Sequence, residues 1–214
     1  MKALFRALFS ATSILFLLQF VSAQVPPMTP FSADMEISSK GDQGLRDAQG
    51  KVFVGSGHMR MNLESNGRET SIITDFATKT VDILLAQQQM YIEHTAGEGP
   101  GRGPGVGQDL RPYDPDHPCA IQPELTCKKV GVEVVNGRTC DHWEMTDKDG
   151  KVANFWIDQK LHFPIKTVSQ NSTMLLSNIK EGEPDASLFR IPSGYHRMDL
   201  RGMVPPGAGG PPQN

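Results

Sequence analysis

Apolar residues recur at every second position over most of the chain, which is typical of β-strands with one buried face. In residues 33–38 and 58–63, alanine, methionine, isoleucine and leucine alternate with charged or polar side chains. Similar short apolar segments follow at 71–76, 80–85 and 89–93. Helical periodicity is almost absent. The pattern therefore predicts a mainly β protein in which successive strands form an antiparallel meander.

The turn residues support this interpretation. Asn66-Gly67, Asn136-Gly137 and Asp149-Gly150 each provide the left-handed backbone angles that tight hairpins require. With 136–137 as a two-residue turn, Val130 is expected opposite Trp143, and Lys129 opposite Glu144 on the other face.

A second hairpin is predicted from 152–158 and 161–168, with its turn within 158–160. Its large apolar residues should lie on consistent faces, with Trp156 on the other side: Phe155, Ile157, Phe163 and Ile165. Pro164 cannot donate a ladder hydrogen bond, so its strand is expected to be an edge or to contain a bulge.

The last expected strand covers 173–180. Asp185 can then cap one short helical turn that brings Leu188 and Phe189 against the sheet. The domain is expected to end with residues 191–195.

The N-terminus has the features of an export signal. Lys2 and Arg6 precede an apolar run over 7–20, and Val21-Ser22-Ala23 has the small-residue pattern of a cleavage site. A retained anchor is the alternative, but the run is shorter than the ~20 residues that span a bilayer. We expect residues 1–23 to be removed, which leaves a periplasmic or secreted protein without a stable membrane anchor.

Composition divides the rest of the chain. Residues 24–30 are predicted to be a flexible linker, 31–200 a single β domain, and 201–214 a disordered Pro/Gly tail. The domain is interrupted by a Gly/Pro-rich insertion at 95–118, which is either mobile or a defined lid.

Three cysteines leave one thiol unpaired in an oxidising compartment. The favoured disulfide joins Cys119 and Cys127 across a short loop, and a Cys127 to Cys140 bridge is the competitor. His117 and His142 lie nearby, but their spacing matches no standard zinc pattern, so no metal site is predicted.

Charge and motifs narrow the function classes. The net charge is −3 and the charges are interspersed, so no basic stripe is available for nucleic acid. The glycines of 97–107 lack the following Lys-Ser/Thr of a phosphate loop, and Gly55-Ser56-Gly57 lacks the outer glycines of a nucleophile elbow. No cofactor and no enzymatic activity are expected, although a hydrolase of unknown type remains the second alternative.

Several motifs together resemble a known family: the run 129–140, the segments 155–158 and 163–166, and Leu188-Phe189-Arg190-Ile191-Pro192. They are similar to exported bacterial proteins of the lipoprotein localisation factor (outer-membrane lipoprotein-sorting) superfamily, and closest to a branch of undefined function. The resemblance covers most of residues 31–198. It implies a single curved antiparallel sheet forming an incomplete barrel with little helix.

Such a half-barrel leaves a concave apolar face that requires a cover. The expected function is non-enzymatic binding of a hydrophobic ligand, such as a lipid or a lipoprotein acyl group. The candidate lining residues are Met59, Met61, Ile83, Leu85, Trp143, Phe155 and Phe163. The first alternative is an envelope structural or protein-interaction module without a small ligand, which would bind a partner protein by strand addition.

Overall fold

A computed structural model describes residues 29–40, 47–95, 117–119 and 124–198. Within these residues the chain forms twelve strands, two short 3₁₀ turns and no α-helix. The strands are β1 (Phe31–Ser39), β2 (Ala48–Gly55), β3 (His58–Ser65), β4 (Arg68–Asp75), β5 (Thr80–Leu85), β6 (Met90–Thr95), β7 (Thr126–Val135), β8 (Arg138–Thr146), β9 (Val152–Asp158), β10 (Phe163–Val168), β11 (Ser172–Glu181) and β12 (His196–Arg197). The 3₁₀ turns are η1 (Ala86–Gln88) and η2 (Ala186–Phe189).

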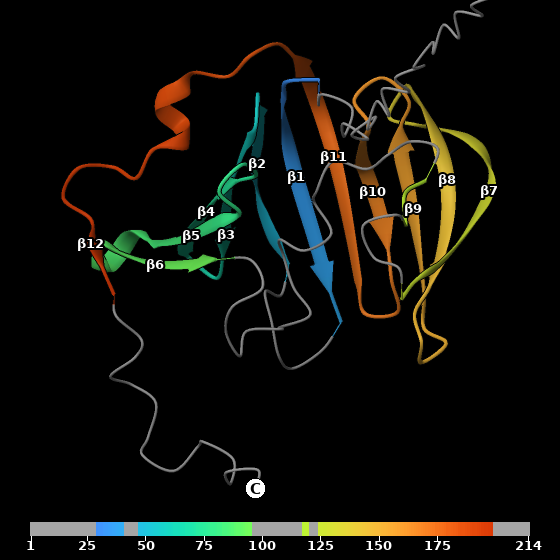
Figure 1. The fold of residues 1–214 in the computed structure, drawn as a ribbon, viewed down its shortest axis with the longest axis horizontal. Coiled ribbons are helices and arrows are strands. Elements are labelled where there is room, and N and C mark those ends of the chain that lie inside the picture. Colours follow the sequence, from blue (N-terminus) through green and yellow to red (C-terminus); the bar gives the residue numbers. More distant parts are fainter. Residues whose placement is uncertain (1–28, 41–46, 96–116, 120–123, 199–214) are drawn as a thin grey trace, which may run out of the picture.

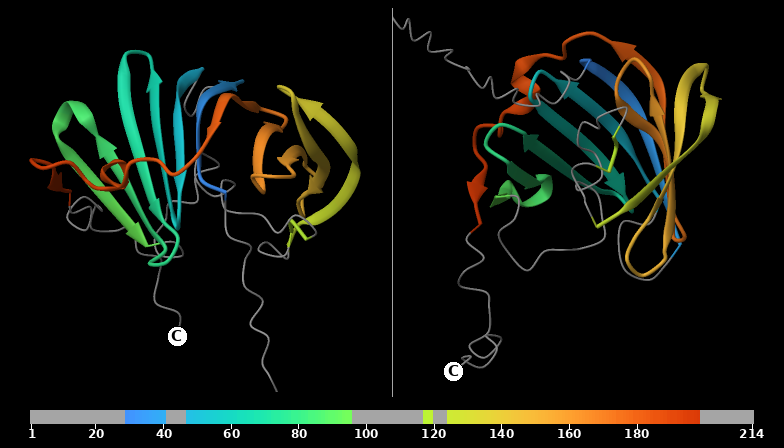
Figure 2. Two further views of the ribbon diagram at one scale, coloured as in Figure 1. Left: turned by 90° about the horizontal axis from the view of Figure 1, so that it is seen from above. Right: turned by 45° about the vertical axis from the view of Figure 1, so that its right-hand side comes forward.

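All twelve strands belong to one sheet, in the order β12-β6-β5-β4-β3-β2-β1-β11-β10-β9-β8-β7 (Figure 1). Every pair is antiparallel except β12 with β6. The sheet is curved, and β12 and β7 remain as its two edges (Figure 2). The predicted fold class, a mainly β chain in one sheet that does not close into a barrel, is confirmed.

One face of the sheet is apolar over its first six strands. The register places side chains in cross-strand rows, since directly opposed residues point to the same side. One such row is Ala33, Val52, Met61, Ile72, Ile83 and Ile92, from β1 through β6. A neighbouring row is Met35, Gly50, Leu63, Thr70, Leu85 and Met90. We call this side the apolar face.

The same face continues into the second half of the sheet. A row runs from Ile37 through Met174, Thr167 and Phe155 to Trp143. The register therefore places Trp143 and Phe155 on the side that also carries Met61. Residues far apart in the sequence thus share one continuous surface.

Bulges interrupt the register at three places. The shift between Pro164 and Lys166 lies in β10, which is an interior strand, so Pro164 sits at a bulge as expected. Another shift lies between Ser32 and Asp34. Near these bends the rings of Phe31 and Phe163 pack edge to face, with centroids 5.2 Å apart.

The third bulge corrects the predicted register of the hairpin at residues 136–137. Its register shifts between Lys129 and Gly131, so Lys129, not Val130, lies opposite Trp143. Lys128 consequently takes the position opposite Glu144. An extra residue in one strand reverses the side of every residue beyond it, and alternation alone does not reveal it.

The second hairpin also differs from expectation. Its turn is longer, because β10 begins at Phe163 and not at residue 161. Phe155 and Ile157 pack in one apolar cluster, whereas Phe163 and Ile165 belong to another, so the four do not share one environment. Phe163 lies opposite Asp158, before the bulge, so the turn itself places it on the other face from Phe155 and Ile157.

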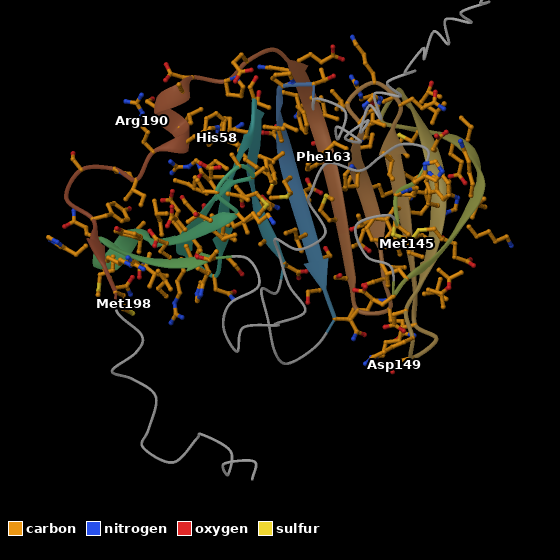
Figure 3. All side chains as sticks on the ribbon, viewed as in Figure 1. His58, Met145, Asp149, Phe163, Arg190 and Met198 are labelled. Carbon is orange, nitrogen blue, oxygen red and sulfur yellow. A yellow bond between two sulfur atoms is a disulfide. The ribbon has the colours of Figure 1, made fainter. Side chains whose placement is uncertain are left out.

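The chain after β11 crosses the side of the sheet opposite the apolar face. Asp185 caps η2 by accepting a hydrogen bond from the Ser187 backbone N–H at 2.8 Å, as predicted. Phe189 stacks on His58, with ring centroids 5.6 Å apart (Figure 3 labels His58). The domain does not end at Tyr195, because β12 then adds a short parallel strand next to β6.

Three predicted segments lie outside the described residues: the signal peptide at 1–23, the tail at 201–214, and nearly all of the insertion at 95–118.

The close approach of β2 and β3 gives a stability prediction. A Cβ at Gly50 would fall within the van der Waals radius of the Asn62 backbone oxygen. We expect Gly50→Ala to lower the free energy of unfolding by about 2 kcal/mol or more, because a backbone atom cannot move aside as a side chain does. Urea denaturation measures the change. In the control Gly131→Ala the new methyl group has no neighbour within 4 Å, and an equal loss in both variants would contradict the assignment.

Candidate ligand-binding face

Burial on the apolar face decreases from the centre of the sheet toward β5 and β6. Phe31, Val52 and Met61 have no exposed surface, and Ile72 in β4 is 6% exposed. The residues at the end of the rows are only half-buried: Val81, Ile83, Leu85, Met90 and Ile92. An apolar surface that is partly accessible at one end can accept a hydrophobic group there.

A second apolar cluster lies near the other edge. Trp143, Met145, Phe155 and Ile157 are buried there, and Cys119, Leu125, Cys127 and Ala153 pack against them. Cys119 and Cys127 form a disulfide with their Cα atoms 6.0 Å apart. The favoured cysteine pairing is thereby confirmed. It also removes two thiolates from the alternative zinc site, and the described residues contain no group of three side chains placed to hold a metal.

The candidate lining residues fall into three environments. Met59, Met61 and Phe163 belong to the main core cluster, and each is at most 1% exposed. Trp143 and Phe155 belong to the second cluster, with 9% and 6% exposure. Ile83 and Leu85 are the half-buried members. The seven residues therefore do not form one group, and the pairing of Phe163 with Asp158 places Phe163 on the other face from Phe155.

Trp143 carries a buried polar atom that lacks a partner. Its indole Nε1 is inaccessible and makes no hydrogen bond to the described residues. Lys129 Nζ lies 5.7 Å from the ring centroid. A buried N–H that makes no hydrogen bond lowers the stability of the fold, so an acceptor oxygen next to Nε1 would be favourable.

The pockets found among the described residues are mainly polar. One, of about 570 Å³, is lined by Asp34, Met35, Glu36, Gln49, Gly50, Lys51, Asn62, Leu63, Glu64, Glu69, Ser177 and Asn178. It contains none of the candidate lining residues. A second, of about 370 Å³, lies where β4 begins and β5 ends, and includes Leu85 together with Arg68, Glu69 and two glutamines.

A polar and aromatic cluster on the opposite face was not predicted. The rings of His142 and Trp156 stack with centroids 4.3 Å apart, and Lys166 Nζ lies 4.1 Å from the Trp156 centroid. Trp156 Nε1 donates to Glu133 at 2.8 Å, and His142 contacts Glu133 and Asn154. The hydrogen bonds from Trp156 and His142 lower the pKa of Glu133. Because these polar groups already bond to one another, we interpret the cluster as structural. The hairpin register indicated that Glu133 and His142 share a face, but no signal indicated Asn154 or Lys166.

A buried charge network joins β8, β9 and β11. Arg138 donates to the carboxylate of Asp158, which is 1% exposed, and to Glu181 at 3.1 Å. The Asp158 carboxylate also accepts the backbone N–H groups of Lys160 and Leu161 at 2.8 Å. The hydrogen bond with Asp158 is the main cause that raises the pKa of Arg138. The network holds the turn after β9 against the end of β11.

Asp82 is a half-buried carboxyl with a different environment. Burial raises its pKa, and Glu93 directly across the strand pair raises it further. Arg197 of β12 binds Glu93 at 2.9 Å. Arg197 thus balances part of the negative charge that Asp82 and Glu93 bring together.

Cys140, the unpaired cysteine, is fully buried. Burial is the main cause that raises the pKa of its thiol to about 12. The thiol therefore stays protonated at neutral pH and is unreactive.

Thiol labelling tests this assignment. At pH 8 only roughly one Cys140 in ten thousand is a thiolate, so iodoacetamide should not label the native protein. In urea without reductant one thiol per chain should react, and with reductant all three cysteines should react. Cys140→Ala is the control and should show no labelling without reductant. Rapid labelling of the native chain would contradict the burial of Cys140.

The fold just described defines a class, the open and curved antiparallel sheet. No protein-family model matches the chain, and no curated protein matches it in sequence. Among solved structures, it is similar to an uncharacterized conserved protein from Thermus thermophilus, with a TM-score of 0.54 and 10% identity over 80% of this chain and 90% of that one. This likeness shows the fold alone.

Two further solved structures extend the comparison. MucB in the MucA/MucB complex of Pseudomonas aeruginosa is similar with a TM-score of 0.48 and 13% identity over 78% of this chain, which spans 56% of the matched chain. A LolA superfamily protein from Nitrosomonas europaea has a TM-score of 0.36 and 11% identity over 77% of this chain and 91% of that one. Both TM-scores are below 0.5, and the likeness to a LolA superfamily protein concerns the fold alone.

The described residues contain no helix long and apolar enough to span a bilayer.

Proposed function

We propose that this protein is an exported, non-enzymatic protein that binds a hydrophobic ligand, such as a lipid or the acyl group of a lipoprotein, on its apolar face. The observation that supports the proposal most directly is the half-buried end of the apolar rows, where Ile83, Leu85, Met90 and Ile92 lie side by side on β5 and β6. Flexible methionine side chains suit a surface that accommodates acyl chains of different shape.

Burial of an acyl chain can supply enough free energy for binding. Burial of one methylene contributes ~0.8 kcal/mol, so a sixteen-carbon chain gains ~13 kcal/mol before the costs of ordering. Micromolar binding requires only ~8 kcal/mol. The disulfide is consistent with an oxidising compartment, which supports a periplasmic or secreted location.

A substitution at the accessible end of the face tests the proposal. Protein purified without detergent is expected to carry an acyl species, detected by native mass spectrometry and lipid extraction. Ile83→Asp should abolish the bound species and weaken binding of a fluorescent fatty acid at least about tenfold, because a carboxylate disfavours apolar contact. Ile83 is half-buried, so the fold should survive. Met61→Asp would test stability instead, because Met61 has no exposed surface.

Val152→Asp is the matched control, since Val152 is a partly exposed valine that alternation in β9 places on the opposite face from Phe155. Equal binding by wild type and Ile83→Asp would overturn the choice of face. Absence of both a bound species and fatty-acid binding in the wild type would overturn the ligand proposal itself.

A further inference from the structure

Strand β7 combines two features that expose it to association. It is the last strand of the sheet, so the backbone groups on its outer side have no strand partner among the described residues. It also carries three of the four exposed large hydrophobic residues in the described part: Val130, Val132 and Val134, with 51%, 57% and 70% exposure. Exposed valines along an unpaired edge favour addition of another strand.

We propose that the outer edge of β7 is an interface at which two copies of this chain pair antiparallel. In the proposed register Lys128 of each copy lies opposite Glu133 of the other, and Lys129 lies opposite Val132. The twofold axis passes between Val130 and Gly131. The sheets of the two copies become continuous, and the interface is independent of the proposed ligand.

The backbone directions fit this register. Thr139 of β8 uses its carbonyl to accept a hydrogen bond from Gln159 N–H at 3.1 Å, so its backbone groups point away from β7. Val134 lies opposite Thr139, and its own N–H and C=O therefore point to the free edge. Alternation gives Val132 the same direction. Residues that must exchange hydrogen bonds between copies thus have outward backbone groups.

The side-chain directions fit as well. Lys128 lies opposite Glu144 and Glu133 lies opposite Cys140, and these two β8 residues are four apart and share a face. Lys128 and Glu133 therefore project on the same side and can form two equivalent charge pairs across the axis. Both side chains are at the surface. The Glu133 carboxylate keeps half of its surface exposed although it already accepts hydrogen bonds from Trp156 and His142.

The bulge favours a second copy over an unrelated strand. An edge with a bulge and lysines resists pairing with regular strands, because the extra residue breaks the register. Two copies each carry the extra residue at Val130, next to the axis, so their registers match again on both sides. Lys128, which would repel a basic strand, lies opposite Glu133 of the second copy.

Sedimentation velocity of the purified protein from about 1 µM to about 1 mM tests the interface. The wild type should change from one to two copies with concentration, and added salt should weaken the dimer because the charge pairs are exposed. Val132→Lys should be monomeric up to about 100 µM. Its matched control, Val152→Lys on β9, should dimerise as the wild type does.

Two further variants separate association from folding. Lys128→Glu changes an exposed side chain and should raise the dissociation constant about tenfold, because it places two like-charge pairs across the axis. Val134→Pro removes only an outward N–H and should block pairing. Circular dichroism and unchanged urea midpoints would show that both fold. A wild type that stays monomeric at every concentration, or variants that dimerise as the wild type does, would overturn the proposal. Capture of a strand from another protein by a monomeric wild type would also overturn it.

Discussion

The need of a single sheet to bury an entire apolar face determines most of this structure. A flat sheet of twelve strands would leave the rows that include Met61 and Ile83 in water, because the described residues contain no α-helix to cover them. Curvature lets one part of the sheet approach another, and the bulges near Ser32 and Pro164 provide it. The contact between Phe31 and Phe163 is the direct result. The charge network around Asp158 then ties the turn after β9 to the end of β11.

The two edges of the sheet differ in the segments that lie beside them. At one edge the chain returns after η2 and adds β12 to β6, and Arg197 then forms an ion pair with Glu93 beside the half-buried carboxyl of Asp82. At the other edge the outer side of β7 has no strand partner among the described residues, and three exposed valines lie along it. The short β12 pairs with only two residues of β6, so each end of the sheet keeps an edge, and the two edges differ in length and in side chains. The proposed ligand-binding face and the proposed association edge are separate surfaces of one sheet.

The sequence predicted the strands well because alternation and turn residues are local signals. The extent of β5, the hairpin at Asn136-Gly137, the Asp185 cap and the Cys119 to Cys127 pairing all depend on neighbours along the chain. The bulge at Val130 could not be predicted, since an extra residue in an alternating run changes no residue type. It shifted the register by one residue, so that Lys128 takes the position opposite Glu144 that was expected for Lys129. The degree of burial could not be predicted from the sequence either. Met61 and Ile83 both lie in alternating segments, but the position of their strands within the sheet makes Met61 a core residue and leaves Ile83 half-buried.

The hairpin of β7 and β8 has a consequence for oxidation of the chain. Once its turn closes, Cys127 lies opposite Met145 and Cys140 lies opposite Glu133. The two sulfur atoms are then on different sides of the ribbon and several residues apart along it, so a bridge between them cannot form. Cys119 can still reach Cys127. Of the three pairings that three cysteines allow, the formed hairpin therefore excludes one. A bridge between Cys127 and Cys140 is open only to a chain that is oxidised before this hairpin forms.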